Sequence, residues 1–414
     1  MLKRSRDSNP CWWCSILVCL LGIEAQFPCP AADGSGRFVQ DTFCIGLWWD
    51  PPIDDRANLY YRQLSEANFN VVLGSGRNAT PEKIARQLEL CGRYRMKALS
   101  YHGNRGTEDL PDGPACWGYL LKDEPKASEF AQLGRQVEEI RKTKPGKLAY
   151  INLYPSHASA KHLGVPGYEE YVTRFLKEVP VDVLCFDRYP VMNPDADERE
   201  GYCDNLGDIR RHALKAGIPF WNFFNIIPYG RHFDPTEAQV VWQVFTSLAY
   251  GAKGVLYFCY WTPTGKEFPK GGAIITADGQ PTRHYEQARR LNARLRKLGP
   301  TLMNLTSTGV LRIKPGETNS AVLAGSPIRS LSDGDYLLGI FRHTDGRRAV
   351  LLNNYRCAYT AWPTVTFDVP LEQVEEVDQQ TGREVPVRDD SPDMPGLQLS
   401  LDAGDGRLFL LPQP

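Results

Sequence analysis

The sequence predicts an α/β fold class, namely a (β/α)8 TIM barrel followed by a small all-β, sandwich-like C-terminal domain. Two observations lead to this prediction. Eight short apolar runs alternate with segments of helical period over about 255 residues, which is the usual size of such a barrel. After Gly299 the pattern changes to alternating strands separated by turns, which is typical of an antiparallel domain.

The apolar runs are nearly continuous, as expected for strands of a parallel sheet that is covered on both faces. They span residues 43–50, 69–75, 96–102, 117–124, 148–154, 181–189, 219–226 and 251–261. A doubly wound open sheet is the alternative arrangement. It would need a glycine-rich phosphate turn after an early strand, and "GSGRNA" at 74–79 lacks the GxGxxG spacing. The closed barrel is therefore preferred.

Amphipathic helices are predicted between most of these strands. In 128–142, Phe130, Leu133, Val137 and Ile140 recur at spacings of three and four, so they form one apolar helix face. The segments 168–179, 203–217, 235–251 and 284–299 are assigned to helices in the same way.

Local signals mark one helix start and one missing helix. Thr80 can cap a helix whose first position is Pro81, where the absent N–H of proline costs nothing. In contrast, residues 103–116, "GNRGTEDLPDGPAC", contain too much glycine and proline for a full helix. The third connection between strands is therefore expected to be a loop.

The C-terminal region contains two hairpin signals. One hairpin turns at Asp345-Gly346 between apolar runs, and a second turns at Gly382. The segment "LQLSLDAGDGRLFLL" closes the chain as part of the same small antiparallel domain. These boundaries place the barrel at 33–302 and the β-sandwich domain at 303–414.

The first 32 residues have the order of an export signal. "MLKRSR" is basic, "CWWCSILVCLLGI" is apolar, and "CPAAD" offers small residues for cleavage near Ala31 or Ala32. The apolar run is shorter than the ~20 residues that a membrane-spanning helix needs. Residues 1–32 are therefore predicted to be a signal peptide of a secreted or periplasmic protein, with an uncleaved anchor as the alternative.

Charge and cysteine usage limit the possible partners. Forty-eight basic residues face 49 acidic ones without a basic patch of any length, so nucleic acid is not an expected partner. Cys44, Cys185 and Cys259 lie inside apolar runs, where cysteine acts as a small hydrophobe. The spacing of the cysteines indicates neither a disulfide framework nor a zinc site. No cofactor, no metal and no membrane contact after signal cleavage are expected, and the oligomeric state is left open.

Chemically active residues gather at the carboxyl ends of the predicted strands, where barrel active sites lie. Aromatic faces stack on the apolar faces of sugar rings, and carboxyl groups bind hydroxyls and transfer protons. This rim therefore predicts a carbohydrate site. Its candidates for binding the substrate are Asp123, Trp48, Trp49, Tyr101, Asn152, Tyr154, Tyr189, Trp221 and Trp261, and its candidates for catalysis are Glu124 and Asp187.

"GYLLKDEP", residues 118–125, places two acids at the tip of a buried strand. Pro125 ends the strand because it lacks a backbone donor. Since neighbouring side chains on a strand alternate, Asp123 and Glu124 are expected to point to opposite sides. One of them would face the substrate while the other is held by neighbouring groups.

The chain resembles the clan of (β/α)8 glycoside hydrolases that contains the family 42-like β-galactosidases. Strand four of that clan ends in Asn-Glu-Pro, and "KDEP" at 122–125 is similar, with Asp123 in the place of the asparagine. The resemblance implies that Glu124 is the general acid/base and that Trp261, at the end of strand eight, lies under the sugar. The trailing β domain also resembles an accessory domain of glycosidases.

One departure from the clan concerns its nucleophile, a glutamate at the end of strand seven, because "PFWNFFNI" has no acid there. Asp187 in "FDRYP" is the candidate second carboxylate, and Arg188 could hold a neighbouring carboxylate ionised. Alternatively, Asp187 only binds Arg or a sugar hydroxyl. The predicted function is hydrolysis of O-glycosidic bonds in an oligo- or polysaccharide. A catalytically inactive carbohydrate-binding barrel and a polysaccharide lyase are the alternatives.

Overall fold

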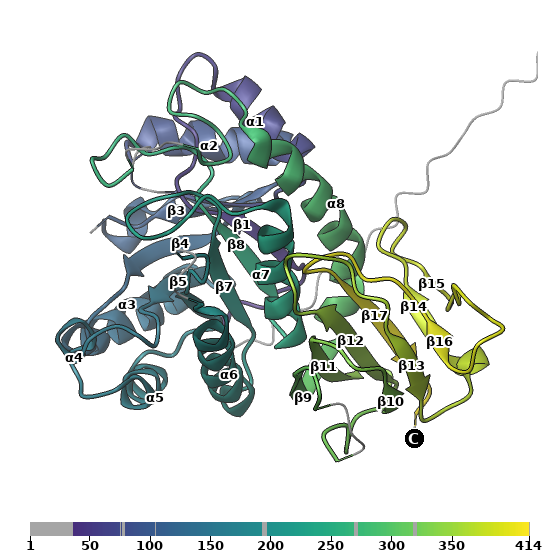
Figure 1. Ribbon diagram of the computed structural model, residues 1–414. Coiled ribbons are helices and arrows are strands. Elements are labelled where there is room, and N and C mark those ends of the chain that lie inside the picture. The colour runs from purple at the N-terminus through teal and green to yellow at the C-terminus, as the bar shows by residue number, and fades with distance from the viewer. Residues whose placement is uncertain are drawn as a thin grey trace, which may run out of the picture. The chain divides into compact units, whose positions relative to one another are not determined.

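The computed structural model describes residues 36–413 except 75, 77–78, 104, 193–196, 269–271 and 318–320. The predicted signal peptide lies outside these residues. Eight parallel strands close into a barrel in chain order, β1 pairing with both β2 and β8 (Figure 1). The strands are β1 Cys44–Leu47, β2 Val71–Leu73, β3 Lys97–Tyr101, β4 Cys116–Asp123, β5 Leu148–Leu153, β6 Leu184–Asp187, β7 Phe220–Asn225 and β8 Gly254–Phe258. The predicted barrel is confirmed.

Helices connect the strands on the outside of the barrel (Figure 1). They are α1 Ala57–Glu66, α2 Pro81–Arg93, α3 Phe130–Thr143, α4 Ala160–Leu163, α5 Tyr168–Glu178, α6 Arg199–Ala216, α7 Glu237–Ala249 and α8 Arg283–Met303. Thr80 caps α2 as predicted, with its hydroxyl accepting from the Lys83 amide at 3.4 Å. The described part of the β3–β4 connection contains only the 3-10 turn η1 Thr107–Asp109, as its glycine and proline content predicts.

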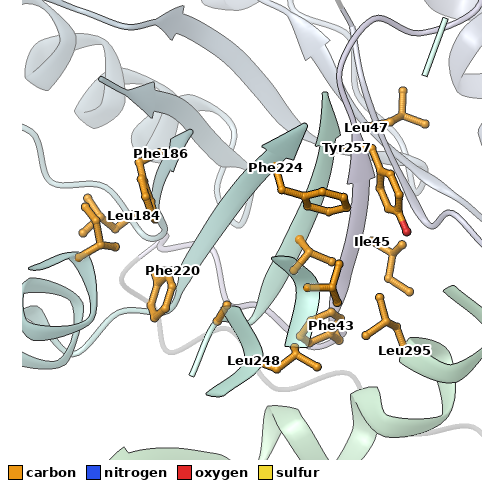
Figure 2. Packing of buried hydrophobic residues seen from close by; sticks show 14 of the residues in the cluster. Phe43, Ile45, Leu47, Leu184, Phe186, Phe220, Phe224, Leu248, Tyr257 and Leu295 are labelled. Atoms are coloured by element: carbon orange, nitrogen blue, oxygen red, sulfur yellow. The ribbon is translucent and has the colours of Figure 1, made fainter. Parts of the chain in front are cut away.

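Two apolar layers hold the barrel together. Outside it, the strands pack against the helices through residues such as Phe224 and Tyr257, with Leu248 of α7 and Leu295 of α8 nearby (Figure 2). Inside it, a separate cluster fills the half at the amino ends of the strands. There Trp221 stacks on Trp117, with their ring centroids 5.8 Å apart. Each such buried side chain contributes about 1.5–3 kcal/mol through the hydrophobic effect. The interior is therefore filled by apolar side chains at the amino ends of the strands and leaves room for polar groups at their carboxyl ends.

The C-terminal region forms two antiparallel sheets. A six-stranded sheet has the order β15-β14-β17-β12-β11-β9, and a three-stranded sheet has the order β10-β13-β16. Their apolar residues share one core, to which Leu352 and Phe409 of the first sheet and Val365 and Phe367 of the second contribute. The strands are β9 Leu305–Ile313, β10 Ile328–Leu331, β11 Tyr336–His343, β12 Arg348–Asn354, β13 Thr364–Phe367, β14 Glu375–Val377, β15 Glu384–Pro386, β16 Leu397–Gln398 and β17 Gly406–Leu411. The predicted β-rich domain and both hairpins are confirmed.

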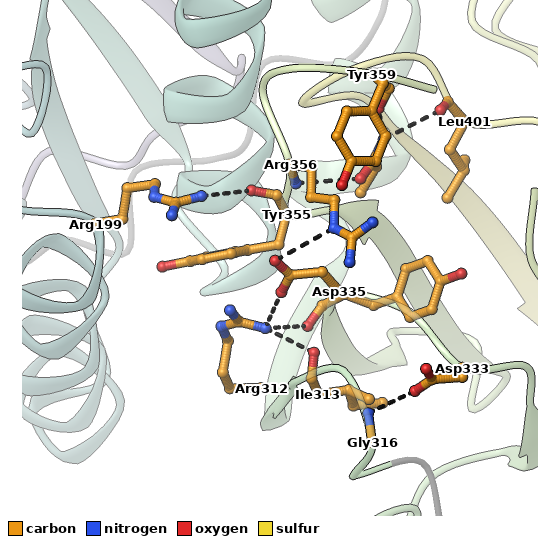
Figure 3. Close-up of polar contacts among 12 residues, drawn as sticks. Arg199, Arg312, Ile313, Gly316, Asp333, Asp335, Tyr355, Arg356, Tyr359 and Leu401 are labelled. Atoms are coloured by element: carbon orange, nitrogen blue, oxygen red, sulfur yellow. Dashed lines mark hydrogen bonds and ion pairs between the residues drawn. The ribbon is translucent and has the colours of Figure 1, made fainter. Parts of the chain in front are cut away.

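Polar contacts join the barrel to these sheets (Figure 3). Arg199 of α6 donates to the backbone oxygen of Tyr355 at 3.3 Å. Within the C-terminal region, the guanidinium of Arg312 on β9 lies 3.6 Å from the centroid of the Tyr355 ring and pairs with Asp335 at 2.6 Å. The barrel and the sheets belong to one compact unit. The seven cysteines of the described residues are free thiols, and Cys44, Cys185 and Cys259 are buried as predicted. Among the described helices, none combines the length and apolar character that crossing a membrane requires.

Candidate active site

A cavity of about 210 Å³ lies at the carboxyl ends of the barrel strands. Six of the residues that the sequence predicted for the site line this cavity, so the fold brings them close to one another. Three more aromatic residues complete the lining. The lining consists of Trp48, Asp123, Glu124, Asn152, Asp187, Tyr189, Phe223, Tyr229 and Phe258.

Asp123 and Glu124 both line the cavity, so the expectation that they point to opposite sides is wrong. Strand β4 ends at Asp123, and Glu124 adopts a left-handed backbone conformation with φ 46°. Its N–H donates to the backbone oxygen of Asn152 at 2.8 Å. Such a conformation is uncommon for a residue other than glycine, and it ends the alternation of the strand. Two adjacent acids can therefore face the same space.

Asn152 on β5 connects two of the acids through its side-chain amide. Its Nδ2 donates to Asp123 Oδ1 at 3.0 Å and to Asp187 Oδ1 at 2.9 Å. Strand β5 lies between β4 and β6, which carry these two acids, so the barrel order itself places the amide between them. Its Oδ1 is buried and has no hydrogen-bond partner among the described residues.

The pKa values of all three acids are raised, although Asp187 is buried, Glu124 is half-buried and Asp123 is exposed at the tip of β4. The pKa of Glu124 is raised to about 7, first by burial and then by the charge of Asp123. The pKa of Asp187 lies well above its ordinary value because of burial and then the charges of Glu124 and Asp123. For Asp123 burial also raises the pKa, while the bond from Asn152 and the charge of Lys122 oppose the increase. These groups repel one another when charged, so the ionisation of one raises the pKa of the others and the three titrate as a set.

No lysine, arginine or histidine is among the residues that line the cavity in the described part of the chain. Arg188 does not line the cavity, so the suggestion that it holds a carboxylate of the site ionised is not supported. Arg188 pairs with Glu198 at 2.6 Å and contacts the ring of His157. Lys122 forms an ion pair with Glu129 at 2.9 Å and does not line the cavity.

The remaining wall of the cavity is aromatic. Tyr189 stacks on Phe258 with ring centroids 5.1 Å apart, and Trp48 meets Phe223 edge-on at 5.8 Å. Sequence reasoning identified Trp48 and Tyr189 but missed the other aromatic residues of the lining. Phe223 and Phe258 could have been found, because they lie on strands β7 and β8 close to the carboxyl ends. Tyr229 lies in the loop after β7, where the sequence carries no signal for it.

Trp221 and Trp261, both predicted to contact the sugar, are not among the residues that line the cavity. Trp221 is the second residue of β7, so it lies near the opposite end of the strand, fully buried, with its N–H donated to Gln40 at 2.9 Å. Strand β8 ends at Phe258, three residues before Trp261. Trp261 is only 4% exposed and packs edge-on against Tyr60 at 4.8 Å.

Trp49, Tyr101 and Tyr154 are also absent from the lining. Tyr101 ends β3 and is exposed. Tyr154 is close enough to Glu124 for that acid to raise its pKa, although burial is the larger cause, and its ring stacks on His162. These three residues therefore lie outside the lining of the cavity.

Strand β7 carries no acid, as its sequence shows. Phe223 occupies the cavity wall there. Asn225, the last residue of β7, is fully buried, and its side-chain amide has no hydrogen-bond partner within the described residues. The carboxyl groups of the cavity therefore come from β4, from the residue after it, and from β6.

No protein-family model matches the chain, and no curated protein matches it. Solved structures do. A family 42 β-galactosidase from G. stearothermophilus superimposes with a TM-score of 0.60 at 9% identity, covering 91% of this chain and 100% of that one. A β-galactosidase from Bacillus circulans sp. alkalophilus has a TM-score of 0.55 at 9% identity, with 89% and 99% covered.

A β-galactosidase from the psychrophilic Marinomonas ef1 has a TM-score of 0.47 at 12% identity. The match covers 62% of this chain and spans 60% of that longer protein. The two matches with TM-scores of 0.55 and 0.60 have 9% identity, so this likeness concerns the fold alone. The chain has the barrel fold of the family 42-like β-galactosidases, which confirms the fold that the resemblance implied.

Proposed function

We propose that this chain is a glycoside hydrolase that cleaves O-glycosidic bonds of an oligo- or polysaccharide, with Glu124 as general acid. The observation that carries the proposal is the position of Glu124. It lies directly after β4, in a cavity with two further acids and an aromatic wall. Its pKa of about 7 lets it hold a proton at neutral pH and still release it. The fold shared with β-galactosidases supports this reading.

In this mechanism Glu124 gives its proton to the glycosidic oxygen of the leaving group as the bond to the anomeric carbon breaks. Asp187 is the second carboxylate, and it either attacks the anomeric carbon or takes a proton from the attacking water. Asp187 must be ionised for either role. The amide of Asn152 favours that form by donating to its Oδ1 at 2.9 Å. One proton shared within the set can therefore reside on Glu124 while Asp187 is charged.

The aromatic residues of the lining suit the binding of sugar. Rings such as those of Trp48 and Tyr189 offer apolar faces and edges to the C–H groups of a sugar, while the carboxyl groups bind its hydroxyls. Asp123 is assigned to orient a hydroxyl, because the Asn152 amide holds it in place at 3.0 Å.

Export is part of the proposal, because a polysaccharide substrate is met outside the cytoplasm. The order of basic, apolar and small residues in 1–32 supports it. N-terminal sequencing of protein recovered from outside the cytoplasm should give a start near residue 32 or 33. Recovery of Met1 from exported protein would contradict cleavage.

A glycan-library screen of the purified protein tests the function. Release of reducing sugars from at least one oligo- or polysaccharide supports hydrolysis. Calorimetric binding of a glycan without turnover would contradict it and favour a carbohydrate-binding barrel without activity. A product that absorbs in the ultraviolet, as an unsaturated sugar does, would indicate a lyase instead.

A further inference from the structure

Three acids line one small cavity without a cation to balance them. Asp123, Glu124 and Asp187 all face this space, and its described lining contains no basic side chain. Asp187 is buried and Glu124 is half-buried, so their charged forms are costly, whereas Asp123 is exposed at the tip of β4; each charge increases the cost of charging the other two acids. A ligand with a positive charge would supply the missing counter-charge, whereas an anionic ligand would add a further like charge.

Asn152 provides an independent sign of a donor-rich ligand. It is 3% exposed and lines the cavity, yet its Oδ1 has no hydrogen-bond partner among the described residues. Both hydrogens of its Nδ2 are used, since this atom donates to Asp123 and to Asp187. An unmade bond to a buried acceptor is costly, so a donor from the ligand is the group this oxygen requires.

The other side chains of the lining offer few donors. Only the indole N–H of Trp48 and the hydroxyls of Tyr189 and Tyr229 can donate, apart from protonated acids. Tyr189, Tyr229 and Phe258 pack together, with the Tyr229 and Phe258 ring centroids 5.4 Å apart. Aromatic rings attract cations through their negative faces. The lining thus combines many acceptors with an electron-rich wall.

The cavity is large enough for an organic ligand. Its volume of about 210 Å³ is several times the roughly 30 Å³ that one water molecule takes up in the liquid. Within the described residues, no three His, Cys, Asp or Glu side chains are grouped so that they could hold a metal ion.

We propose that the cavity recognises a glycoside whose sugar ring carries a protonated amine, that is, an amino sugar without an acyl group on its nitrogen. The ammonium group would donate to the carboxyl groups and to Asn152 Oδ1, and the ring would lie against the aromatic wall. This inference rests on the proposed glycosidase function and names the class of its substrate.

Calorimetric binding on the full-length mature protein tests the inference. At pH 7, glucosamine and galactosamine are compared with glucose, galactose, their N-acetylated amines and the two matching uronates. We expect at least one free amine to bind tenfold or more tightly than its neutral counterpart, and the uronates to bind most weakly. Binding of the amine should also release protons, which appear as a heat that depends on the buffer, because a cation lowers the pKa of nearby acids.

Two variants locate the effect. Asp123→Asn removes one charge from the cavity and should reduce the preference for the amine several-fold. Asp41→Asn removes the same charge from an exposed position before β1, at the opposite end of the barrel, and should preserve it. Equal binding of amines and neutral sugars, tighter binding of uronates, or no detectable binding of either amine would overturn the inference.

The inference and the function fail in different ways. Hydrolysis of neutral glycosides without a preference for amines would contradict only the amino-sugar specificity. Tight binding of amines without hydrolysis of any glycoside would contradict only the proposed catalysis.

Discussion

Asn152 at the end region of β5 donates its side-chain amide to Asp187 at the end of β6, with 2.9 Å between Nδ2 and Oδ1. The same nitrogen donates to Asp123 on β4. One neutral amide thus holds acids from two other strands, and its bonds favour their charged forms against a burial that opposes them. This arrangement lets ionised and protonated acids occupy one small cavity.

Asn152→Ala tests the role of this amide. Without the hydrogen bonds from Asn152, the pKa values of Asp123 and Asp187 should rise further, so a smaller fraction of these two acids is ionised at neutral pH. We expect kcat to fall by roughly 10²-fold, which is the usual cost of losing a well-placed donor. The rising limb of the pH–rate profile should move to higher pH. An unchanged kcat and profile would show that the amide has no part in the reaction.

Glu124 should also affect how stability depends on pH. Its pKa of about 7 in the folded protein lies above its ordinary value of 4.5, so the folded state holds this proton more tightly than the unfolded state. The resulting stability is fully present below pH 4.5 and is lost as pH rises to about 7. Glu124→Gln does not suffer this loss. The difference in Tm between Glu124→Gln and wild type should therefore be more positive at pH 8 than at pH 4.5, by roughly 1–3 °C.

Glu138→Gln is the matched control, because Glu138 is an exposed residue of α3. Thermal melts of wild type and both variants at pH 4.5 and pH 8 give the comparison. If Glu124→Gln and Glu138→Gln respond to pH in the same way, Glu124 does not hold its proton in the folded protein.

Trp48 and Trp261 should respond differently to substitution. Trp48 lines the cavity, so Trp48→Ala should weaken substrate binding by ~1–3 kcal/mol through lost stacking and burial. Trp261 is a buried core residue, so Trp261→Ala should cost ~3–5 kcal/mol of the free energy of unfolding. Denaturant melts and KM values of both variants check this. A stable Trp261→Ala protein with a greatly raised KM would contradict the core assignment and show that Trp261 contributes to substrate binding.

The barrel was predictable because the signals that determine it are local. The apolar run 117–124 became β4, and Thr80 became the cap of α2, since burial and capping depend on residues close in sequence. The position of Trp261 was not predictable in the same way. Residues 254–261 are apolar throughout, so the sequence does not show that β8 ends at Phe258.

The geometry of the site depends on contacts between distant residues. "KDEP" predicts two acids at a strand tip, but only the structure shows that Glu124 turns into the left-handed region and faces the same cavity as Asp123. Tyr229 enters the cavity from a loop whose sequence has no pattern that indicates it. The guanidinium of Arg188 pairs with Glu198, ten residues further along the chain, and the sequence does not show this pairing.

Glu124→Gln, assayed on a natural glycan and on aryl glycosides with very acidic leaving groups, tests the central claim most directly. Gln is nearly isosteric with Glu but cannot donate the proton, and a good leaving group needs none. The account predicts that kcat on the natural glycan falls by roughly 10²–10⁴, the usual effect of positioned proton transfer, while the aryl glycosides are affected far less. Near-normal turnover of the natural glycan by a folded Glu124→Gln protein would contradict the assignment of Glu124 as the general acid.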